Sequence, residues 1–337
     1  MENPRKILLI QLKRIGDVLL TTPAVSMVRR AYPDAEITFM TQGVAAEIYR
    51  NNPDVNHVWQ VPSLISLWAK IRLLADVRAA GFDLVIDFMA NPTTALIAFV
   101  SGARIRLGFD KRVRRLAYTH LGTGSPDSSY SPDDNIHLLN AINISGEFHG
   151  LTFPVSDDAR DFANPLLKDA GMGPEDRLVT CSPVSRQPYK VWPAESFAAV
   201  NDFLIREYGA GIFFLWGPGE EHFVDAVISA MKERPLEKAD VNTLQRTKAV
   251  IDQAWMHVGN DNAIRHFAIA ADVATVGIFG KTRARNWTPP GSAEKHLAFD
   301  HDPGCKSSCV YPKCGLECLS AISPEQVIEE IRVRTDP

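Results

Sequence analysis

Long apolar runs are missing from this sequence. A membrane-spanning helix needs about 20 consecutive apolar residues, whereas the longest apolar stretch here, "TTALIAFV", is bounded by Pro92 and Ser101. The opening "MENPRK" leads directly into a short apolar run that is not followed by a cleavage site. We therefore expect neither a membrane span nor a signal peptide, and we predict a cytoplasmic protein.

The sequence also has no excess of positively charged residues. The 337 residues carry a formal net charge of -4, and the sequence pI is about 6.2. Because general nucleic-acid binders are usually basic, we expect no nucleic-acid partner. The content of 45% hydrophobic and 23% charged residues is ordinary for a globular chain, and the length suits two domains.

Cysteine is scarce outside one cluster. Cys181 stands alone, and the other four form the pattern C-x3-C-x4-C-x3-C, at Cys305, Cys309, Cys314 and Cys318. Four thiolates could hold a structural zinc ion, although the spacing differs from the usual C-x2-C. Disulfides and free thiols are the alternatives, and a reducing compartment disfavours disulfides.

Strand and helix patterns alternate in both halves of the chain. In the first half we predict strands at 6–12, 36–41, 55–62, 82–89 and 105–109, with helices at 21–33, 45–51, 64–81 and 91–103. A polar loop (122–134) and a linker between residues 150 and 174 follow. The second half has strands at 177–183, 210–217 and 274–280, helices at 193–209, 220–233, 262–273 and 323–334, and a helix that runs into a strand over 249–261. This order predicts two doubly wound parallel sheets, which bind ligands at the carboxyl ends of their strands.

A carboxylate follows the first strand. In "LKRIGDVLLTTPAV", Gly16 and Asp17 stand where the strand ends and a helix begins. Asp17 could cap that helix or serve as a general base toward a ligand, and the two roles can coexist.

The second half contains groups suited to a phosphorylated ligand. In "VGNDNAIRHFAIAADVATVGIFGKT", Asp261 ends a strand and a helix starts at once, and helix starts attract anions. Lys190, in "YKVWP", could neutralise a departing phosphate, and a carboxylate of "WGPGEE" could hold ribose hydroxyls. His266 either packs in the core or contacts phosphate or sugar. Lys281 and Thr282 are either simple turn residues or diphosphate ligands.

Four segments together resemble glycosyltransferase family 9, the ADP-heptose:lipopolysaccharide heptosyltransferases. They are "ILLIQLKRIGDVLLTTPAV", "KVWPAESFA", "WGPGEE" and "GNDNAIRHFAIAADVATVGIFGKT", in the order that the family shows. The resemblance implies a GT-B fold, in which two Rossmann-like domains face a central cleft. Residues 1–165 would bind the acceptor and residues 174–322 the nucleotide sugar, with a last helix in 323–337 that could pack back on the first domain.

The same resemblance implies an inverting transfer from an ADP-sugar that needs no cofactor. Asp17 matches the general base and Lys190 the lysine on the donor phosphates. The remaining donor-site residues would be Ser182, Glu220, Glu221, Asp261, Asn262, Ala263, His266, Lys281 and Thr282. Ala263 and Ile264 replace the family's usual Gly-Pro, and Ala274 replaces a proline.

The segment 104–115 is strongly basic. It holds six cations against one acid, Asp110, and its simplest interpretation is a solvated helix face. The resemblance suggests instead contact with an anionic lipopolysaccharide core or lipid A acceptor at the inner-membrane surface, where the protein would be peripheral. The expected acceptor-side residues are Lys13, Arg14, Arg104, Arg106, Arg112 and Arg115.

Two other functions remain open at this stage. The altered residues after Asp261 and Asn262 would suit a family member that binds a nucleotide sugar without turnover. Another GT-B enzyme, such as a nucleotide-sugar epimerase, would act on the sugar with no acceptor present.

Overall fold

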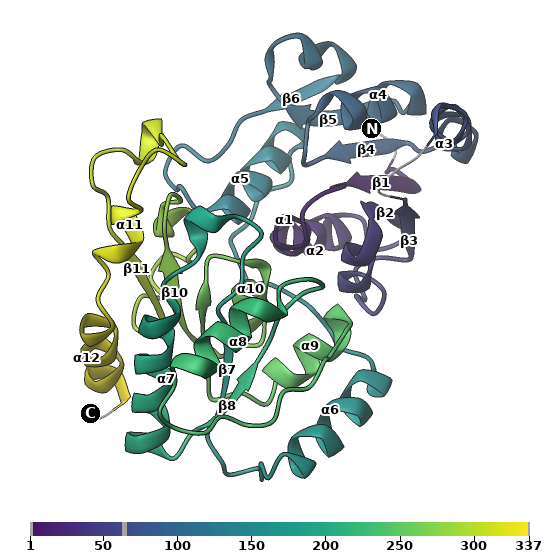
Figure 1. The fold of residues 1–337 in the computed structure, drawn as a ribbon. Coiled ribbons are helices and arrows are strands. Elements are labelled where there is room, and N and C mark those ends of the chain that lie inside the picture. Colours follow the sequence, from purple (N-terminus) through teal and green to yellow (C-terminus); the bar gives the residue numbers. More distant parts are fainter. Residues whose placement is uncertain (1–2, 63–65, 336–337) are drawn as a thin grey trace. The chain divides into compact units, whose positions relative to one another are not determined.

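The computed structural model describes residues 3–62 and 66–335. The chain folds into two compact units, Met1–Pro154 and Val155–Pro337, each with its own parallel sheet (Figure 1). Within the described ranges, no helix is long and apolar enough to cross a membrane. Residues 64–65, where the helix 64–81 was expected to begin, lie outside these ranges.

The first unit contains a six-stranded parallel sheet. Its strands are β1 (Lys6–Ile10), β2 (Glu36–Gln42), β3 (His57–Val61), β4 (Leu84–Asp87), β5 (Ile105–Phe109) and β6 (His120–Gly122). Their order in the sheet is β3-β2-β1-β4-β5-β6. The strand order reverses between β1 and β4, and the carboxyl ends at such a switch point form a ligand crevice in open parallel sheets.

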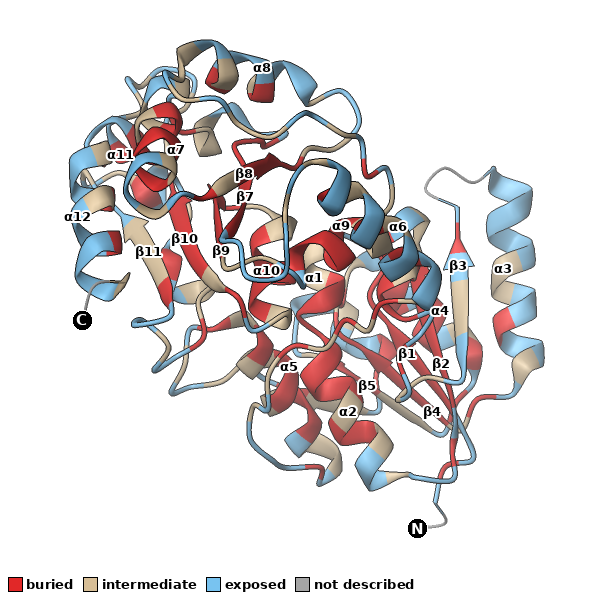
Figure 2. Ribbon diagram, turned by 90° about the horizontal axis from the view of Figure 1, so that it is seen from below, coloured by how far each residue is buried: buried red, intermediate tan, exposed pale blue. Residues whose placement is uncertain are grey.

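Helices cover both faces of this sheet. The first unit contains α1 (Ile15–Leu19), α2 (Thr22–Ala31), α3 (Leu67–Ala80), α4 (Pro92–Ser101), α5 (Ser131–Leu138), and the 3-10 helices η1 (Gly43–Ile48), η2 (Arg112–Ala117) and η3 (Leu139–Ile142). The inner sides of α3, α4 and η2 share one apolar core with β1 and β4. Figure 2 shows that β1, β2 and β4 are largely buried, whereas β3 and α3 are largely exposed or half-buried.

Local sequence signals explain where α4 begins and ends. The Asn91 side chain accepts hydrogen bonds from the backbone N–H groups of Thr93 (2.8 Å) and Thr94 (2.9 Å). Pro92 occupies the first helical position, where no N–H is needed. Gly102 ends the helix with φ 67°, a left-handed conformation that glycine adopts without strain.

The second unit contains a five-stranded parallel sheet. Its strands are β7 (Leu178–Ser182), β8 (Gly211–Phe214), β9 (Met256–Asn260), β10 (Ala274–Phe279) and β11 (His296–Asp300). Their order is β11-β10-β9-β7-β8, so the switch point lies between β7 and β9. Its helices are α6 (Asp157–Asp169), α7 (Ala194–Tyr208), α8 (Glu221–Ala230), α9 (Leu244–Ile251), α10 (Ala263–Ala270), α11 (Glu317–Ser320), α12 (Pro324–Thr335), and the 3-10 helices η4 (Pro188–Lys190), η5 (Ala284–Asn286) and η6 (Lys306–Ser308).

The region between the units differs from the expected linker. Helix α6 lies inside the segment 150–174, and it packs against α9 in the second unit. The sequence-based division placed residues up to 165 in the first domain, whereas the two compact units divide after Pro154. Strands β6 and β11 and helix α5 were also not anticipated.

The last helix belongs to the second unit. Helix α12 packs against α7, and the Tyr208 and Thr335 hydroxyls lie 2.6 Å apart. Ser323 and Gln326 exchange reciprocal side-chain-to-backbone hydrogen bonds of 3.2 Å, which is a capping box. A contact of this helix with the first unit stays a prediction.

Candidate functional site

Asp17 lies at the carboxyl end of β1, beside the switch point of the first sheet. It is half-buried in the first turn of α1, where a carboxylate interacts favourably with the helix dipole. The N-cap of α1 is Arg14, and this residue makes no side-chain capping hydrogen bond. Asp17 therefore does not occupy the N-cap position, which was one of the two roles that the sequence suggested for it. Lys13 and Arg14 are exposed in the same turn.

A second carboxylate, Asp87, lies at the adjoining strand end. It is paired with Ile10 in the register of β4 on β1. Its fully buried side chain accepts hydrogen bonds from the N–H groups of Met89 (3.0 Å) and Ala90 (2.9 Å) and from the Tyr118 hydroxyl (2.7 Å). Burial raises the pKa of Asp87, and these hydrogen bonds oppose the rise. Asp87 thus fixes the turn after β4, a role that the sequence analysis did not anticipate.

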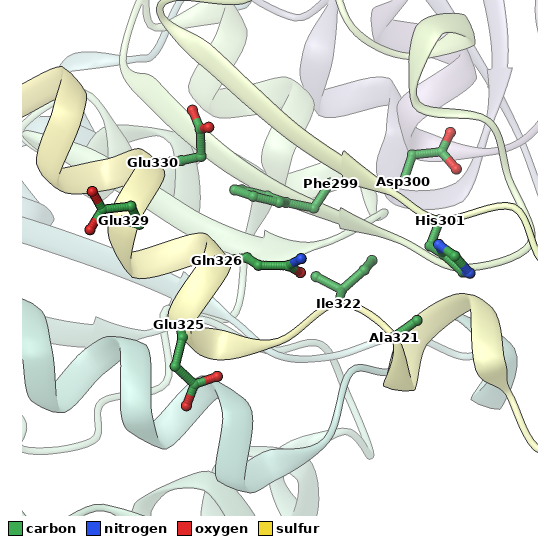
Figure 3. A pocket seen from close by; sticks show the side chains of 9 residues that line it. All are labelled: Phe299, Asp300, His301, Ala321, Ile322, Glu325, Gln326, Glu329 and Glu330. Atoms are coloured by element: carbon green, nitrogen blue, oxygen red, sulfur yellow. The ribbon is translucent and has the colours of Figure 1, made fainter.

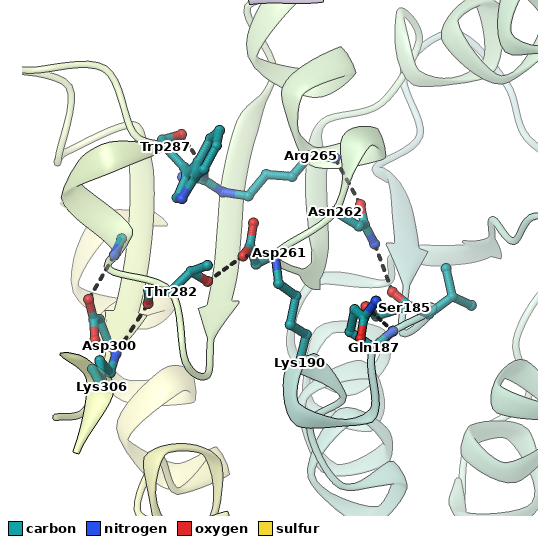
Figure 4. A network of polar contacts seen from close by, with 12 residues as sticks. Ser185, Gln187, Lys190, Asp261, Asn262, Arg265, Thr282, Trp287, Asp300 and Lys306 are labelled. Carbon is teal, nitrogen blue, oxygen red and sulfur yellow. Dashed lines mark hydrogen bonds and ion pairs between the residues drawn. The ribbon is translucent and has the colours of Figure 1, made fainter. Parts of the chain in front are cut away.

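Of the donor-site residues expected from the sequence, Asp261, Asn262 and Thr282 lie with Lys190 at the carboxyl ends of β7, β9 and β10 (Figure 4). Lys190 Nζ donates to Asp261 Oδ2 at 2.6 Å, and the Thr282 hydroxyl donates to the same oxygen. The side chains of Lys190 and Asp261 are only 17% and 6% exposed. The ion pair therefore lies in a region where charges are poorly solvated, which strengthens its effect on a ligand.

Asn262 caps helix α10 and joins it to β7. Its Oδ1 accepts hydrogen bonds from the N–H groups of Ile264 (2.9 Å) and Arg265 (3.3 Å). Its Nδ2 donates to the carbonyl oxygens of Ser182 (3.3 Å) and Val184 (3.1 Å) and to Ser182 Oγ (3.1 Å). Asn262 therefore fixes the helix start beside the Lys190–Asp261 pair, and Ala263 is the first residue of that helix.

Ser182 lies in a buried polar chain beneath this helix start. Its fully buried Oγ lies 3.0 Å from His257 Nε2, and His257 Nδ1 lies 3.0 Å from the Thr180 hydroxyl. Burial, assisted by the cation of Arg265, lowers the pKa of His257 to about 3. Ser182 is thus already engaged by Asn262 and His257, so in this structure it supports the site.

His266 is a buried, neutral histidine in α10. Burial and the nearby Arg265 cation lower its pKa to about 3, so the imidazole is uncharged at neutral pH. Its Nδ1 is buried and has no hydrogen-bond partner among the described residues. The ring lies 6.0 Å from that of Trp287. Because buried polar atoms are usually paired, this nitrogen is a candidate for contact with a ligand.

Arg265 supports the site and was not anticipated from the sequence. Its side chain is 1% exposed, lies over the Phe279 ring, and donates to the Trp287 carbonyl (3.0 Å) and the Thr288 hydroxyl (3.1 Å). A Cβ on Gly277 would lie 2.4 Å from Arg265 Nε. The glycine in "TVGIF" is the only sequence signal for this buried cation.

Two lysines flank the loop after β10. Lys281 Nζ lies 5.5 Å from the centre of the Tyr189 ring. Lys306 is buried, pairs with Asp300, and donates to the Thr282 carbonyl at 3.2 Å (Figure 4). Burial lowers the pKa of Lys306. Lys306 was not expected, because its segment is marked in the sequence only by clustered cysteines.

The two carboxylates after β8 have different partners. Glu220 folds back on its own turn, where Oε2 accepts a 3.0 Å hydrogen bond from the Gly217 N–H. Glu221 lies in the first turn of α8 and forms a 2.7 Å ion pair with Lys238. Glu220 is therefore the carboxylate held at the tight turn after β8.

The basic segment 104–115 is not one helix face. It consists of β5 followed by η2. The Arg106 side chain donates to the carbonyl oxygens of Ala117 (2.8 Å) and Ala103 (2.7 Å), so it holds the fold together. Arg115 lies 3.5 Å from Asp110 at the surface. Arg104 and Arg112 are also exposed.

The clustered cysteines do not form a metal site in the structure. All five cysteines are free thiols. Within residues 3–62 and 66–335, no three His, Cys, Asp or Glu residues come together in a way that could hold a metal ion. The structural zinc expected as one alternative is therefore not supported, and neither are disulfides. Cys318 packs in the apolar core of the second unit.

A surface pocket of about 640 Å³ lies between β11 and α12 (Figure 3). Four carboxylates line it, those of Asp300, Glu325, Glu329 and Glu330. A nucleoside diphosphate would meet repulsion there. This pocket is therefore a poor candidate for the donor site expected from the sequence.

Comparisons with known proteins agree with this geometry. The profile of glycosyltransferase family 9 (heptosyltransferase) matches residues 70–314. Lipopolysaccharide heptosyltransferase 3 of Escherichia coli K12 is 26% identical over 287 residues, which cover 81% of this chain and 82% of that protein.

Solved structures show the same fold. A family 9 glycosyl transferase from Veillonella parvula aligns with a TM-score of 0.85 and 24% identity, over 99% of this chain and 98% of that one. The Escherichia coli heptosyltransferase WaaC with ADP-2-deoxy-2-fluoro heptose aligns with a TM-score of 0.69 and 20% identity, over 97% and 99% of the two chains. The predicted GT-B fold class is confirmed.

Proposed function

The chain belongs to glycosyltransferase family 9, and from this membership we propose that it moves a heptose, or a similar sugar, from an ADP-sugar to a lipopolysaccharide core acceptor. Membership makes it a glycosyltransferase of the heptosyltransferase type. The donor, the acceptor, inversion at the anomeric carbon and transfer without a metal cofactor are the parts that we propose.

The observation that carries the donor assignment is the meeting of Lys190, Asp261 and Thr282 beside the start of α10. The dipole of a helix start and a nearby ammonium favour a diphosphate. The buried His266 Nδ1 offers a further polar contact. A relative of the same fold was solved with an ADP-heptose analogue.

We assign Lys190 as the residue that stabilises the leaving group, ADP. In the transfer, the bond between the anomeric carbon and the diphosphate oxygen breaks as the acceptor oxygen forms the new bond. Negative charge then grows on the departing ADP, and an ammonium in a poorly solvated site stabilises that charge. The Lys190 ammonium has three N–H donors, so it can bind a phosphate oxygen while it keeps its contact with Asp261.

We assign Asp17 as the general base that accepts the proton of the acceptor hydroxyl. The acceptor hydroxyl loses its proton as its oxygen attacks, and a carboxylate within hydrogen-bond reach accepts that proton. Asp17 lies at the carboxyl end of β1, in the crevice region of the first sheet. Lys13 and Arg14, exposed in the same turn, are suited to an acidic acceptor.

We further propose that Arg104, Arg112 and Arg115 meet anionic groups of the acceptor at the inner-membrane surface, with the protein peripheral to it. All three are exposed, and guanidinium groups bind phosphate and carboxylate through two hydrogen bonds. Arg106 is a weaker candidate because its guanidinium already binds backbone carbonyls.

Isothermal titration with ADP, UDP, GDP and ADP-heptose tests the donor. We expect ADP-heptose to bind selectively and more tightly than ADP alone. A preference for UDP or GDP would overturn the donor. An absence of binding would favour a degenerate family member.

The reaction itself is tested with a lipopolysaccharide core acceptor. We expect ADP release that requires the acceptor. If the donor binds but no acceptor leads to the release of ADP, the result would favour a non-catalytic binding protein. Conversion of the nucleotide sugar without an acceptor would favour an epimerase.

A further inference from the structure

Large apolar side chains are exposed on one layer of the first unit. This layer consists of α3, α4 and η2, and we call it the α3–α4–η2 layer. Of the ten large apolar residues that are exposed in the described part of the chain, seven lie in it: Leu67, Trp68, Ile71, Leu96, Phe99, Val113 and Leu116. Trp68 and Val113 are each 80% exposed. Single exposed apolar residues are common, but such a concentration indicates an interaction surface.

These side chains point away from the same core. Val77 of α3, Ile97 of α4 and Ala117 of η2 are buried in one apolar cluster with residues of the sheet. Helix α4 packs against both α3 and η2. The exposed residues of the three elements therefore lie on the outer side of one continuous layer, of which α3 and α4 are seen in Figures 1 and 2.

The layer is also strongly cationic. Over α3, α4 and residues 110–117 it has seven cations, Lys70, Arg72, Arg78, Lys111, Arg112, Arg114 and Arg115, against two carboxylates, Asp76 and Asp110. Its formal charge is thus +5, while that of the whole chain is -4. Both carboxylates are paired with arginines of the layer, Asp76 with Arg72 at 3.9 Å and Asp110 with Arg115 at 3.5 Å.

We propose that the outer side of the α3–α4–η2 layer docks the protein on an anionic phospholipid bilayer. Tryptophan and phenylalanine rings insert at the level of the headgroups, and lysines and arginines meet the lipid phosphates. A second copy of the chain is a poor occupant, because two faces of charge +5 repel each other. The inference rests on the proposed function, which places the acceptor in a membrane, and it names the surface that reaches that membrane.

Vesicle co-sedimentation of the full chain tests the proposal. We expect binding to phosphatidylcholine vesicles that contain phosphatidylglycerol, little binding to phosphatidylcholine alone, and release by salt. The variant W68E/F99E places carboxylates at two exposed positions and should bind about tenfold or more weakly. The matched control V333E changes an exposed valine of α12, 61% exposed in the second unit, and should bind like the unchanged protein.

The outcomes separate docking from catalysis. W68E/F99E should retain its thermal melting temperature and its ADP release with a lipid-free core acceptor, because neither residue belongs to the proposed site. The docking proposal is wrong if the unchanged protein does not bind anionic vesicles. It is also wrong if V333E and W68E/F99E lose vesicle binding equally, whatever the rate of ADP release. If vesicle binding behaves as expected but no acceptor supports ADP release, the proposed function fails alone. If W68E/F99E instead converts a dimer into a monomer in sedimentation velocity, the layer is an interface between copies and the proposal is overturned.

Discussion

Lys190 and Asp261 form an ion pair that is nearly withdrawn from water. Removal of one partner leaves the other charge poorly solvated, which destabilises a protein by several kcal/mol when the pair is fully buried. Removal of both charges avoids that penalty. The pair therefore allows the structural role of Lys190 to be separated from its role toward the donor.

The first prediction concerns this pair. Lys190→Met should lower the free energy of unfolding by roughly 2–3 kcal/mol, and the added change Asp261→Asn should restore most of it. Donor binding should be lost in both variants, because neither has the ammonium. Urea denaturation and titration with ADP-heptose measure the two effects.

Two results would contradict this prediction. If K190M were as stable as the unchanged protein, the ion pair would not contribute to the free energy of unfolding. If K190M/D261N regained donor affinity, Lys190 would not be a donor ligand.

The second prediction concerns Asp17. Asp17→Ala should reduce kcat by about 10² to 10⁴-fold, the usual range for loss of a general base, and should leave ADP-heptose binding unchanged. Asp17→Asn, which preserves size but accepts no proton, should behave in the same way. Steady-state kinetics and titration calorimetry provide the measurements. An equal loss of binding and turnover would make Asp17 a structural residue.

At the scale of elements, the start of α10 depends on one side chain. Asn262 caps the helix and also binds β7 and the segment after it through Ser182 and Val184.

The third prediction follows from this double role. Asn262→Ala should destabilise the protein by about 1–2 kcal/mol, the upper range for loss of an N-cap, and should weaken ADP binding because the helix start is no longer fixed. Ser66→Ala is the matched control, since Ser66 caps the exposed helix α3 through a single 3.2 Å hydrogen bond. Thermal melting and ADP titration should show a larger effect for Asn262. Equal effects would mean that the bonds to β7 contribute nothing.

Several elements were predictable from local sequence, and others were not. Ser323 and Pro324 predicted the start of α12, and its capping box confirms this. Helix α6 has a comparable signal, because Ser156 accepts a hydrogen bond from the Ala159 N–H and two aspartates follow it. Pro165 inside that helix concealed the pattern. Strand β11, "HLAFD", begins and ends with a polar residue and is only partly buried, so it lacks the apolar run that marked most of the predicted strands.

The candidate site was predictable only in part. Asp261, Lys190 and Thr282 were expected from strand ends and motif resemblance, and the structure brings them together. Arg265, Lys306 and Asp87 were not expected, because a buried charge is recognised by its partners, and those partners are distant in sequence. Local patterns carry no information on such pairs.

At the scale of the molecule, the second unit buries three histidines, His257, His266 and His296. Burial is the main cause that lowers their pKa values, to about 3 for the first two and about 4 for the third. An unfolded histidine has a pKa near 6.5. Between these values the unfolded chain binds protons that the folded chain does not, so folding stability falls as the pH decreases.

The fourth prediction is acid sensitivity of the whole chain. Between pH 6 and pH 4.5, each of these histidines should reduce the free energy of unfolding by up to about 1.4 kcal/mol per pH unit. His257→Gln should reduce that slope by the contribution of about one bound proton. His301→Asn, at an exposed position, is the control variant. Urea denaturation across this pH range measures the slope, and equal slopes in all three proteins would contradict the assignment.

The free thiols of the second unit offer a chemical handle. Cys181 is buried, and burial raises its pKa to about 12, so alkylating reagents should spare it. Cys305 and Cys309 are partly exposed and flank Lys306, which binds the loop of Thr282. Lys306, next to Cys305, binds the Thr282 carbonyl, and the Thr282 hydroxyl binds Asp261, so a fluorescent or spin label on Cys305 would be connected to the Lys190–Asp261 pair without any engineered cysteine. The native sequence thus carries its own position for a reporter of donor binding.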